Sequence, residues 1–256
     1  IKKETRKFFV FSDSLLTDNF LNLSKGLKKM YPKKELAQLV IAACHQFEID
    51  TVVISPGSRN APLTVGFSNH KDFKTLGSSR TDGLVSANEF AFELFMKEEV
   101  DMDSFLEGLN KYFPTDIKAL SITEVDDKFN IINSPKTKEY LYLFSFGEKA
   151  HPFSASLMAS FVDTLDVNLM KEGAKLFEGE HNFKKYAVKP SANTNFNREV
   201  LVSEIVENDL YKANFFPETS YIYRIRSKGF MRGQIRMMMG QLIMLGKGEI
   251  TLENIK

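Results

Sequence analysis

The stretch Gly77–Ala87 holds the residues of this chain that are best suited to chemistry. It reads GSSRTDGLVSA, with Arg80 two positions before Asp82. In an extended backbone, side chains two positions apart point the same way. A neighbouring guanidinium favours the ionised form of a carboxyl group, and an ionised, positioned carboxylate can act as a nucleophile. The same residues also fit a solvated surface turn with a weak ion pair.

The sequence lacks the signatures of the common cofactor-dependent and metal-dependent enzymes. There is no GxxxxGK[ST] or GxGxxG stretch and no GxSxG elbow around a serine. The four histidines have no metal-ligand spacing, and a single cysteine, Cys44, supplies neither a zinc cluster nor an intrachain disulfide. We therefore expect no cofactor and no metal. The single cysteine also indicates a reducing compartment.

Charge is distributed unevenly, although the formal net charge is only +1. No acidic residue occurs between Glu218 and Glu249. The cations of that stretch are Arg224, Arg226, Lys228, Arg232, Arg236 and Lys247. A basic stripe of this kind can hold phosphates. The alternative is a basic face that is paired with acids elsewhere in the fold.

The apolar runs of the sequence bear on the localisation of the protein. No apolar run reaches the roughly 18 residues needed to span a membrane, and the start of the chain has too short an apolar core for a secretion signal. We expect a cytoplasmic protein without a membrane partner.

The first third of the chain predicts a helix–helix–strand order. Apolar spacing favours helices at 14–30 and 34–47, and TVVIS at 51–55 favours a buried strand before the turn-rich loop 56–62. This order is typical of the edge of a parallel α/β unit.

From residue 73 onward the pattern predicts long strands and a few helices. The expected strands are 89–97, 117–125, 139–146, 198–207 and 219–227, and the expected helices are 101–113, 166–179 and 230–246. On the strand 139–146, alternation places four aromatic residues, beginning with Tyr140, on one face. The fold class is therefore α+β, with a mostly antiparallel sheet and flanking helices, preceded by the short α/β-like segment.

Several of these segments resemble one enzyme family. SSRTDGLVSAN resembles the GRTDAGVHA stretch of TruA-type tRNA pseudouridine synthases. The stretches 106–130, 136–142 (KTKEYLY), 177–183 (FEGEHNF) and 230–248 resemble further family segments in the same order. The resemblance covers about residues 73–256, which makes the chain similar to an enzyme that isomerises uridine to pseudouridine in the anticodon stem and loop of tRNA.

The resemblance also implies roles for particular residues. Asp82 falls on the catalytic aspartate, Arg80 on an arginine that displaces the target base, Tyr140 on an active-site tyrosine that stacks on that base, and Arg236 on an arginine that pairs with the aspartate. Tyr140 also fits a core aromatic, and Arg236 a phosphate or surface arginine. The other expected substrate-binding residues are Thr81, Arg224, Arg226 and Arg232. The implied partners are tRNA and, in a possible homodimer, a second copy of the chain.

The first third resembles a different protein. Residues 31–73, with SPGSRNAPL at 55–63, resemble the start of the thiamine-diphosphate enzyme MenD. The cofactor-activating glutamate of that family is missing, so thiamine chemistry is not supported. We accordingly expect three parts: a segment of foreign resemblance at 1–72, the rest of the N-terminal catalytic half at 73–150, and the C-terminal half at 151–256. A catalytically dead RNA-binding fragment or fusion product is the alternative function, followed by a thiamine-diphosphate-type binding module.

Overall fold

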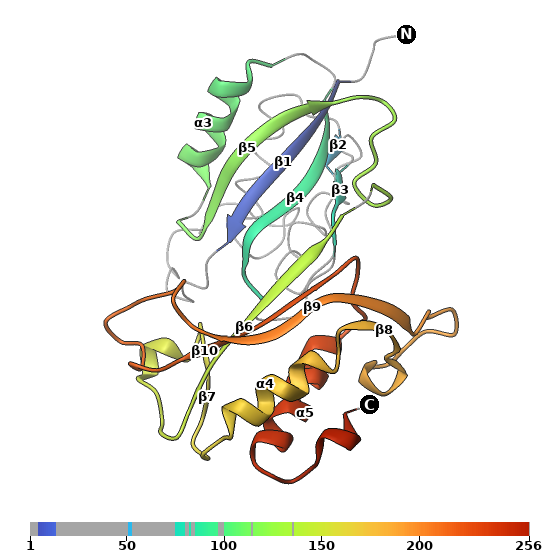
Figure 1. Cartoon of the computed structure of the whole chain (residues 1–256). Coiled ribbons are helices and arrows are strands. Elements are labelled where there is room, and N and C mark those ends of the chain that lie inside the picture. The colour runs from blue at the N-terminus through green and yellow to red at the C-terminus, as the bar shows by residue number, and fades with distance from the viewer. Residues whose placement is uncertain are drawn as a thin grey trace, which may run out of the picture. The chain divides into compact units, whose positions relative to one another are not determined.

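A computed structural model describes residues 5–13, 51–52, 75–79, 82, 85–96, 100–113, 115–134 and 136–255. The chain forms two units, residues 1–134 and 135–256. Each unit has its own β-sheet, with α3 in the first unit and α4 and α5 in the second (Figure 1), which confirms the predicted α+β class. All described strand pairs except one are antiparallel, also as predicted.

The first unit is built on a sheet whose centre is strand β4. The strands are β1 (Thr5–Asp13), β2 (Thr51–Val52), β3 (Thr75–Gly77), β4 (Ala87–Met96) and β5 (Ile117–Val125). Strand β1 lies between β4 and β5, while β2 and β3 pair with the other edge of β4.

Helix α3 (Met102–Tyr112) joins β4 to β5 in the chain. Asp101 caps it, because its carboxylate accepts a 2.9 Å hydrogen bond from Ser104 N. The Asn110 side chain then binds both backbone groups of Ala119, at 2.9 and 2.8 Å. These two bonds fix the last turn of α3 against β5.

The division of the chain differs from the predicted one. Strands β1 and β2 come from the segment 1–72 that we expected to be separate, yet both pair with β4. Thr51–Val52 pairs antiparallel, where the sequence predicted the edge of a parallel unit. The second boundary lies after Ser134 rather than after residue 150, so β6 belongs to the second unit. The reason is that β6 pairs with β10, a strand some eighty residues further on. The helices predicted at 14–30 and 34–47, the loop 56–62 and the MenD-like stretch lie outside the described residues, apart from Thr51–Val52.

The second unit has a five-stranded sheet in the order β7-β6-β10-β9-β8. Its strands are β6 (Lys138–Phe146), β7 (Ala159–Phe161), β8 (Gly179–Asn182), β9 (Asn197–Glu207) and β10 (Tyr221–Ser227). Strand β7 runs parallel to β6, and the other pairs are antiparallel. The helices are α4 (Val167–Lys175) and α5 (Gln234–Gly246), with single 3-10 turns at Pro152–Ser154, Lys184–Tyr186 and Leu252–Asn254.

One face of this sheet packs against both helices. Tyr223 and Ile225 of β10 form a core with Met170 of α4 and with Met238 and Leu242 of α5, and all five side chains are fully buried. The aromatic face predicted for β6 joins this core, which confirms the alternation read from the sequence. Burial of such side chains is worth roughly 1.5–3 kcal/mol each.

Helices α4 and α5 approach closely at a glycine. A Cβ built on Gly173 meets the side chain of Leu245 and lies 2.9 Å from Cδ1 of Ile255. Gly246 faces Met170 in the same way, with its sulfur 2.6 Å from a built Cβ. The two helices therefore depend on small residues where they touch.

Candidate active site

Asp82 lies in the connection between strands β3 and β4 of the first unit. The entry to this loop is held by a 3.0 Å hydrogen bond from Ser78 N to Ala91 O. The Asp82 side chain is half-buried. Arg80 and Thr81, the residues predicted to act with it, lie outside the described residues. The structure therefore places the predicted nucleophile in a loop of a β-hairpin, where the sequence predicted a loop.

Tyr140 lies on β6 in the second unit and is half-buried. Its backbone pairs with that of Ile225 on β10. Its ring meets the ring of Phe230 edge to face, with the centroids 5.4 Å apart and the planes at 89°. Aromatic pairs prefer this geometry. Phe230 comes from the segment between β10 and α5, so two elements fix the position of the Tyr140 ring.

Arg236 projects from the first turn of α5 and is exposed. Burial raises the pKa of the Tyr142 phenol, and the charge of Arg236 partly offsets that rise. The guanidinium is therefore close enough to interact with Tyr142, which shares a face of β6 with Tyr140. The structure thus brings two of the three predicted catalytic residues to the same side of the second unit. Asp82 belongs to the first unit, and its pairing with Arg236 stays a prediction.

The start of α5 has an unusual backbone. Gly233 is the N-cap residue and has a left-handed backbone, with φ of 68°. A Cβ built there would lie 2.6 Å from Cγ2 of Val188. Arg232, a predicted substrate-binding residue, is exposed just before it, and its carbonyl accepts a 3.2 Å bond from Val188 N. The helix predicted to begin at 230 begins at Gln234 because this turn precedes it.

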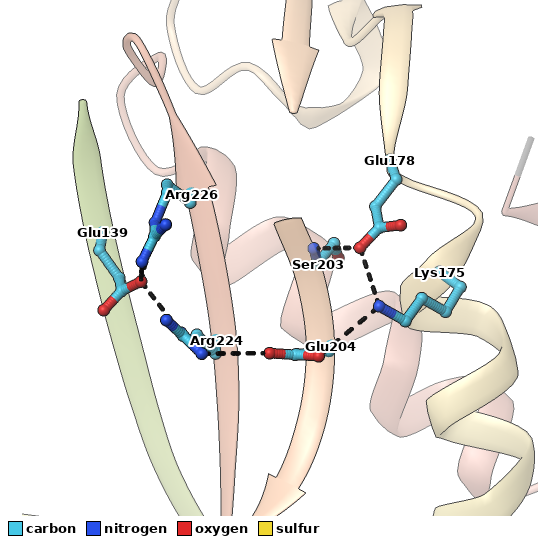
Figure 2. A network of polar contacts seen from close by, with 7 residues as sticks. All are labelled: Glu139, Lys175, Glu178, Ser203, Glu204, Arg224 and Arg226. Atoms are coloured by element: carbon cyan, nitrogen blue, oxygen red, sulfur yellow. Dashed lines mark hydrogen bonds and ion pairs between the residues drawn. The ribbon is translucent and has the colours of Figure 1, made fainter. Parts of the chain in front are cut away.

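Arg224 and Arg226 lie on the opposite face of the sheet from Tyr223 and Ile225. Figure 2 shows both guanidiniums converging on one oxygen of Glu139, across the strand pair. The Glu139 Oε2 atom accepts from Arg224 Nε at 2.9 Å and from Arg226 Nη2 at 2.6 Å. Burial raises the pKa of Glu139, but these hydrogen bonds and charges outweigh it, and the net pKa is lowered.

The ion pairs continue from Arg224 around the edge of the sheet. Arg224 Nη1 lies 3.4 Å from Glu204, which lies 3.6 Å from Lys175 of α4. Lys175 bonds Glu178 at 2.9 Å, and the other bond to that carboxylate oxygen is a 2.8 Å hydrogen bond from Ser203 N (Figure 2). Strand β8 ends its pairing with β9 at Val200, so Glu178 satisfies a backbone donor that β8 does not reach. This network ties α4 to the sheet.

These pairs match the alternative interpretation of the basic stripe. Arg224 and Arg226 have acidic partners, and so do Lys228, which pairs with Glu199 at 3.2 Å, and Lys247, which pairs with Asp163. Of the other two, Arg232 lies just before α5 and Arg236 lies in its first turn, where its charge acts on Tyr142. Within the described residues no cluster of three or more His, Cys, Asp or Glu could hold a metal ion. None of the described helices is long and apolar enough to cross a membrane.

Comparison with known proteins identifies the family. Residues 174–256 match the family model of tRNA pseudouridine synthases. The chain is 30% identical over 186 residues to tRNA pseudouridine synthase A 2 of a Bacillus cereus strain, covering 72% of each protein. It is 28% identical over 192 residues to tRNA pseudouridine synthase A of Thermodesulfovibrio yellowstonii, covering 73% of the chain and 74% of that protein. The corresponding enzyme of Oenococcus oeni is 27% identical over 216 residues, 82% of each chain.

The chain belongs to the tRNA pseudouridine synthase family. The family model begins within α4 and takes in β8, β9, β10 and α5, and thus Arg236. Residues 73–256 make up less than three quarters of the chain, so the match to the Oenococcus oeni enzyme, at 82%, includes residues before 73. This agrees with the structure, in which strands from the first third complete the sheet of the first unit.

Three residues around Tyr140 were not singled out by the sequence reasoning. Phe230 contacts the ring of Tyr140, and Tyr142 interacts with the charge of Arg236. Lys138 is the first residue of the strand that carries both tyrosines. The only signal in the sequence was the lysine-rich stretch KTKEYLY, together with strand alternation. Contacts between β6 and the segment before α5 join residues ninety positions apart, which no local spacing encodes.

Proposed function

We propose that this chain isomerises uridine to pseudouridine in the anticodon stem and loop of tRNA, with Asp82 as the nucleophile. The similarity to tRNA pseudouridine synthases over 72% of the chain carries the proposal. The GSSRTDGLVSA stretch supports Asp82, because it is the segment that resembles the family's catalytic loop.

The reaction conserves every atom of the substrate. The bond from C1′ of the ribose to N1 of uracil breaks, the base rotates, and a bond from C1′ to C5 forms. The hydrogen of C5 leaves as a proton, and N1 takes one up. Asp82 attacks the nucleoside, either at the sugar or at the base, and leaves again when the new bond has formed. No oxidant or reductant is consumed.

The remaining predicted residues prepare this step. The target base must leave its stack, at a cost of a few kcal/mol, and Arg80 fills the vacated space. Tyr140 stacks on the displaced base and takes part in the final proton transfer. Arg236 keeps Asp82 ionised, because an opposite charge nearby favours the carboxylate. Thr81, Arg224, Arg226 and Arg232 contact the RNA backbone.

The test is conversion of uridine in an unmodified tRNA transcript, mapped chemically at single-nucleotide resolution. We expect product with the wild-type chain and none with Asp82→Ala or Asp82→Asn. Asp103→Ala is the matched control, because Asp103 is an exposed aspartate of the same unit on α3. Equal activity of the wild type and Asp82→Ala would remove Asp82 from its role.

A catalytically dead RNA-binding protein is the second candidate. It predicts tRNA binding that weakens steeply with salt, without any pseudouridine. The acidic partners of Arg224, Arg226, Lys228 and Lys247 argue against strong phosphate binding by these four side chains. Although residues 31–73 resemble MenD, the cofactor-activating glutamate is missing, so we expect no thiamine diphosphate binding. Calorimetry with magnesium present would check this. Sedimentation of the free chain would test the homodimer.

A further inference from the structure

Lys138 is the first residue of β6, two positions before Tyr140. Side chains two apart on a strand share a face, so the ammonium lies on the tyrosine side of the sheet. Its backbone pairs with that of Ser227, the last residue of β10. The Ser227 hydroxyl is already used, since it donates to Glu199 O at 2.7 Å. Lys138 thus stands at the end of the strand that positions Tyr140.

The charge of Lys138 has no acidic partner among the described residues, although its side chain is half-buried. Burial lowers the pKa of the ammonium group, and the neighbouring charge of Lys136 lowers it further. Arg224 and Arg226 differ from it in this respect, because both pair with Glu139. A desolvated cation beside a second cation costs folding free energy unless an anion binds there.

An anion that pairs with Lys138 would therefore come from a bound molecule. A tRNA supplies phosphates along its whole length, and lysine binds phosphate as a compact point charge. Same-face neighbours on a strand lie about 7 Å apart, so a nucleotide whose base stacks on Tyr140 has its own backbone within reach of Lys138.

We propose that Lys138 binds a phosphate of the tRNA beside the nucleotide that occupies Tyr140, and so positions the target base. This inference rests on the proposed function, since it takes tRNA as the ligand and Tyr140 as the stacking residue. Lys138 is a positioning residue, because it touches the backbone of the RNA and not the reacting atoms. The half-buried ammonium of Lys138 then lowers the folding stability but strengthens tRNA binding.

The experiment compares Lys138→Met with Lys212→Met in the full chain. Methionine keeps the methylene stem and removes the charge, and Lys212 is an exposed lysine in the β9–β10 connection of the same unit. For Lys138→Met we expect weaker tRNA binding and a salt dependence whose slope falls by about one phosphate contact. The KM for tRNA rises, whereas the single-turnover rate at saturating tRNA changes little. The melting temperature stays the same or rises, because a desolvated charge is gone.

Lys212→Met should leave the affinity, the salt slope and KM as in the wild type, and Lys138→Arg should restore most of the binding. A lower melting temperature of Lys138→Met with an unchanged salt slope would make the lysine structural and overturn the inference. Equal weakening by both methionine variants would reduce it to a general charge effect. Asp82→Ala separates the two proposals, since it should abolish product while binding tRNA as the wild type does. A wild-type chain that does not bind tRNA would overturn both.

Discussion

The rings of Tyr140 and Phe230 meet at 89° with their centroids 5.4 Å apart. Tyr140 lies on the sheet and Phe230 on the segment that leads into α5, so the pair couples the strand to the helix that carries Arg236. The orientation of the tyrosine is therefore a tertiary property of the second unit.

Phe230→Ala should loosen the Tyr140 ring without touching the substrate. The edge-to-face contact is worth about 0.5–1.5 kcal/mol beyond the buried area, so we expect the melting temperature to fall by a few degrees. The single-turnover rate should fall about tenfold, because the stacking partner of the base is no longer held. Phe230→Tyr keeps the ring and is the matched control. A rate equal to that of the wild type would mean that Phe230 does not position Tyr140.

Tyr140→Phe separates stacking from proton transfer. The phenyl ring still stacks on a base, so tRNA affinity should stay within about twofold of the wild type. If the hydroxyl transfers a proton, the single-turnover rate should drop by a factor of about 10² to 10⁴. Tyr142→Phe, one same-face position along β6, is the control and should change the rate little. A single-turnover rate of Tyr140→Phe equal to that of the wild type would mean that the hydroxyl transfers no proton and that Tyr140 acts by stacking alone.

Local pattern was enough to predict most single elements. The strand 117–125 has the predicted bounds, and the helices predicted at 101–113 and 166–179 form behind the N-caps Asp101 and Asp166. These features depend on alternation and on side chains within three positions of the cap. Strand β1 was not predicted, because its partners β4 and β5 lie 74 or more residues further along the chain. Pairing at that separation is decided by the whole sheet rather than by the nine residues themselves.

The sequence proposed residues for the candidate site but not the ion pairs around them. The resemblance pointed to Tyr140 and Arg236, and strand alternation predicted the face that Tyr140 shares with Tyr142. The register of β6 against β10 decides that Glu139, and not an RNA phosphate, holds Arg224 and Arg226 in the free protein. Register depends on tertiary packing. The acid-free stretch between Glu218 and Glu249 therefore did not show that Glu139 pairs with these arginines.

Glu139→Gln tests whether Arg224 and Arg226 also bind RNA. The change removes the carboxylate charge that both guanidiniums share, so tRNA affinity at low salt should rise several-fold. Glu199→Gln is the matched control, because it removes the partner of Lys228 elsewhere in the same unit. The gain should vanish in the double variant Glu139→Gln, Arg226→Ala. An equal gain with Glu199→Gln would reflect net charge alone and would argue against a phosphate site at these arginines.

Glu178 should give the protein an acid-sensitive link between α4 and β9. Burial raises its pKa, but the hydrogen bond from Ser203 N and the charge of Lys175 outweigh burial, and the net pKa is lowered from its ordinary 4.5. A carboxyl group with a lowered folded pKa stabilises the fold above its unfolded pKa and loses that contribution as the pH falls through the folded value. The free energy of unfolding should therefore decrease below about pH 4.5, and less steeply in Glu178→Gln. Urea unfolding at pH 7 and at pH 3.5 measures this, and parallel losses in both proteins would contradict it.

Gly233→Ala should disturb the start of α5 and with it Arg236. The glycine has φ of 68°, and a built Cβ lies 2.6 Å from Val188 Cγ2, so alanine meets both backbone strain and a clash. We expect a loss of about 1–3 kcal/mol in the free energy of unfolding and a lower single-turnover rate, because Arg236 lies one turn further on. Val188→Ala makes room for the new methyl group and should restore part of the stability of Gly233→Ala, whereas the backbone strain remains. Gly240→Ala is the control within the same helix, since a Cβ there meets nothing within 4 Å, and it should be neutral or slightly stabilising. If Gly233→Ala is as stable and as active as the wild type, the left-handed N-cap does not position Arg236.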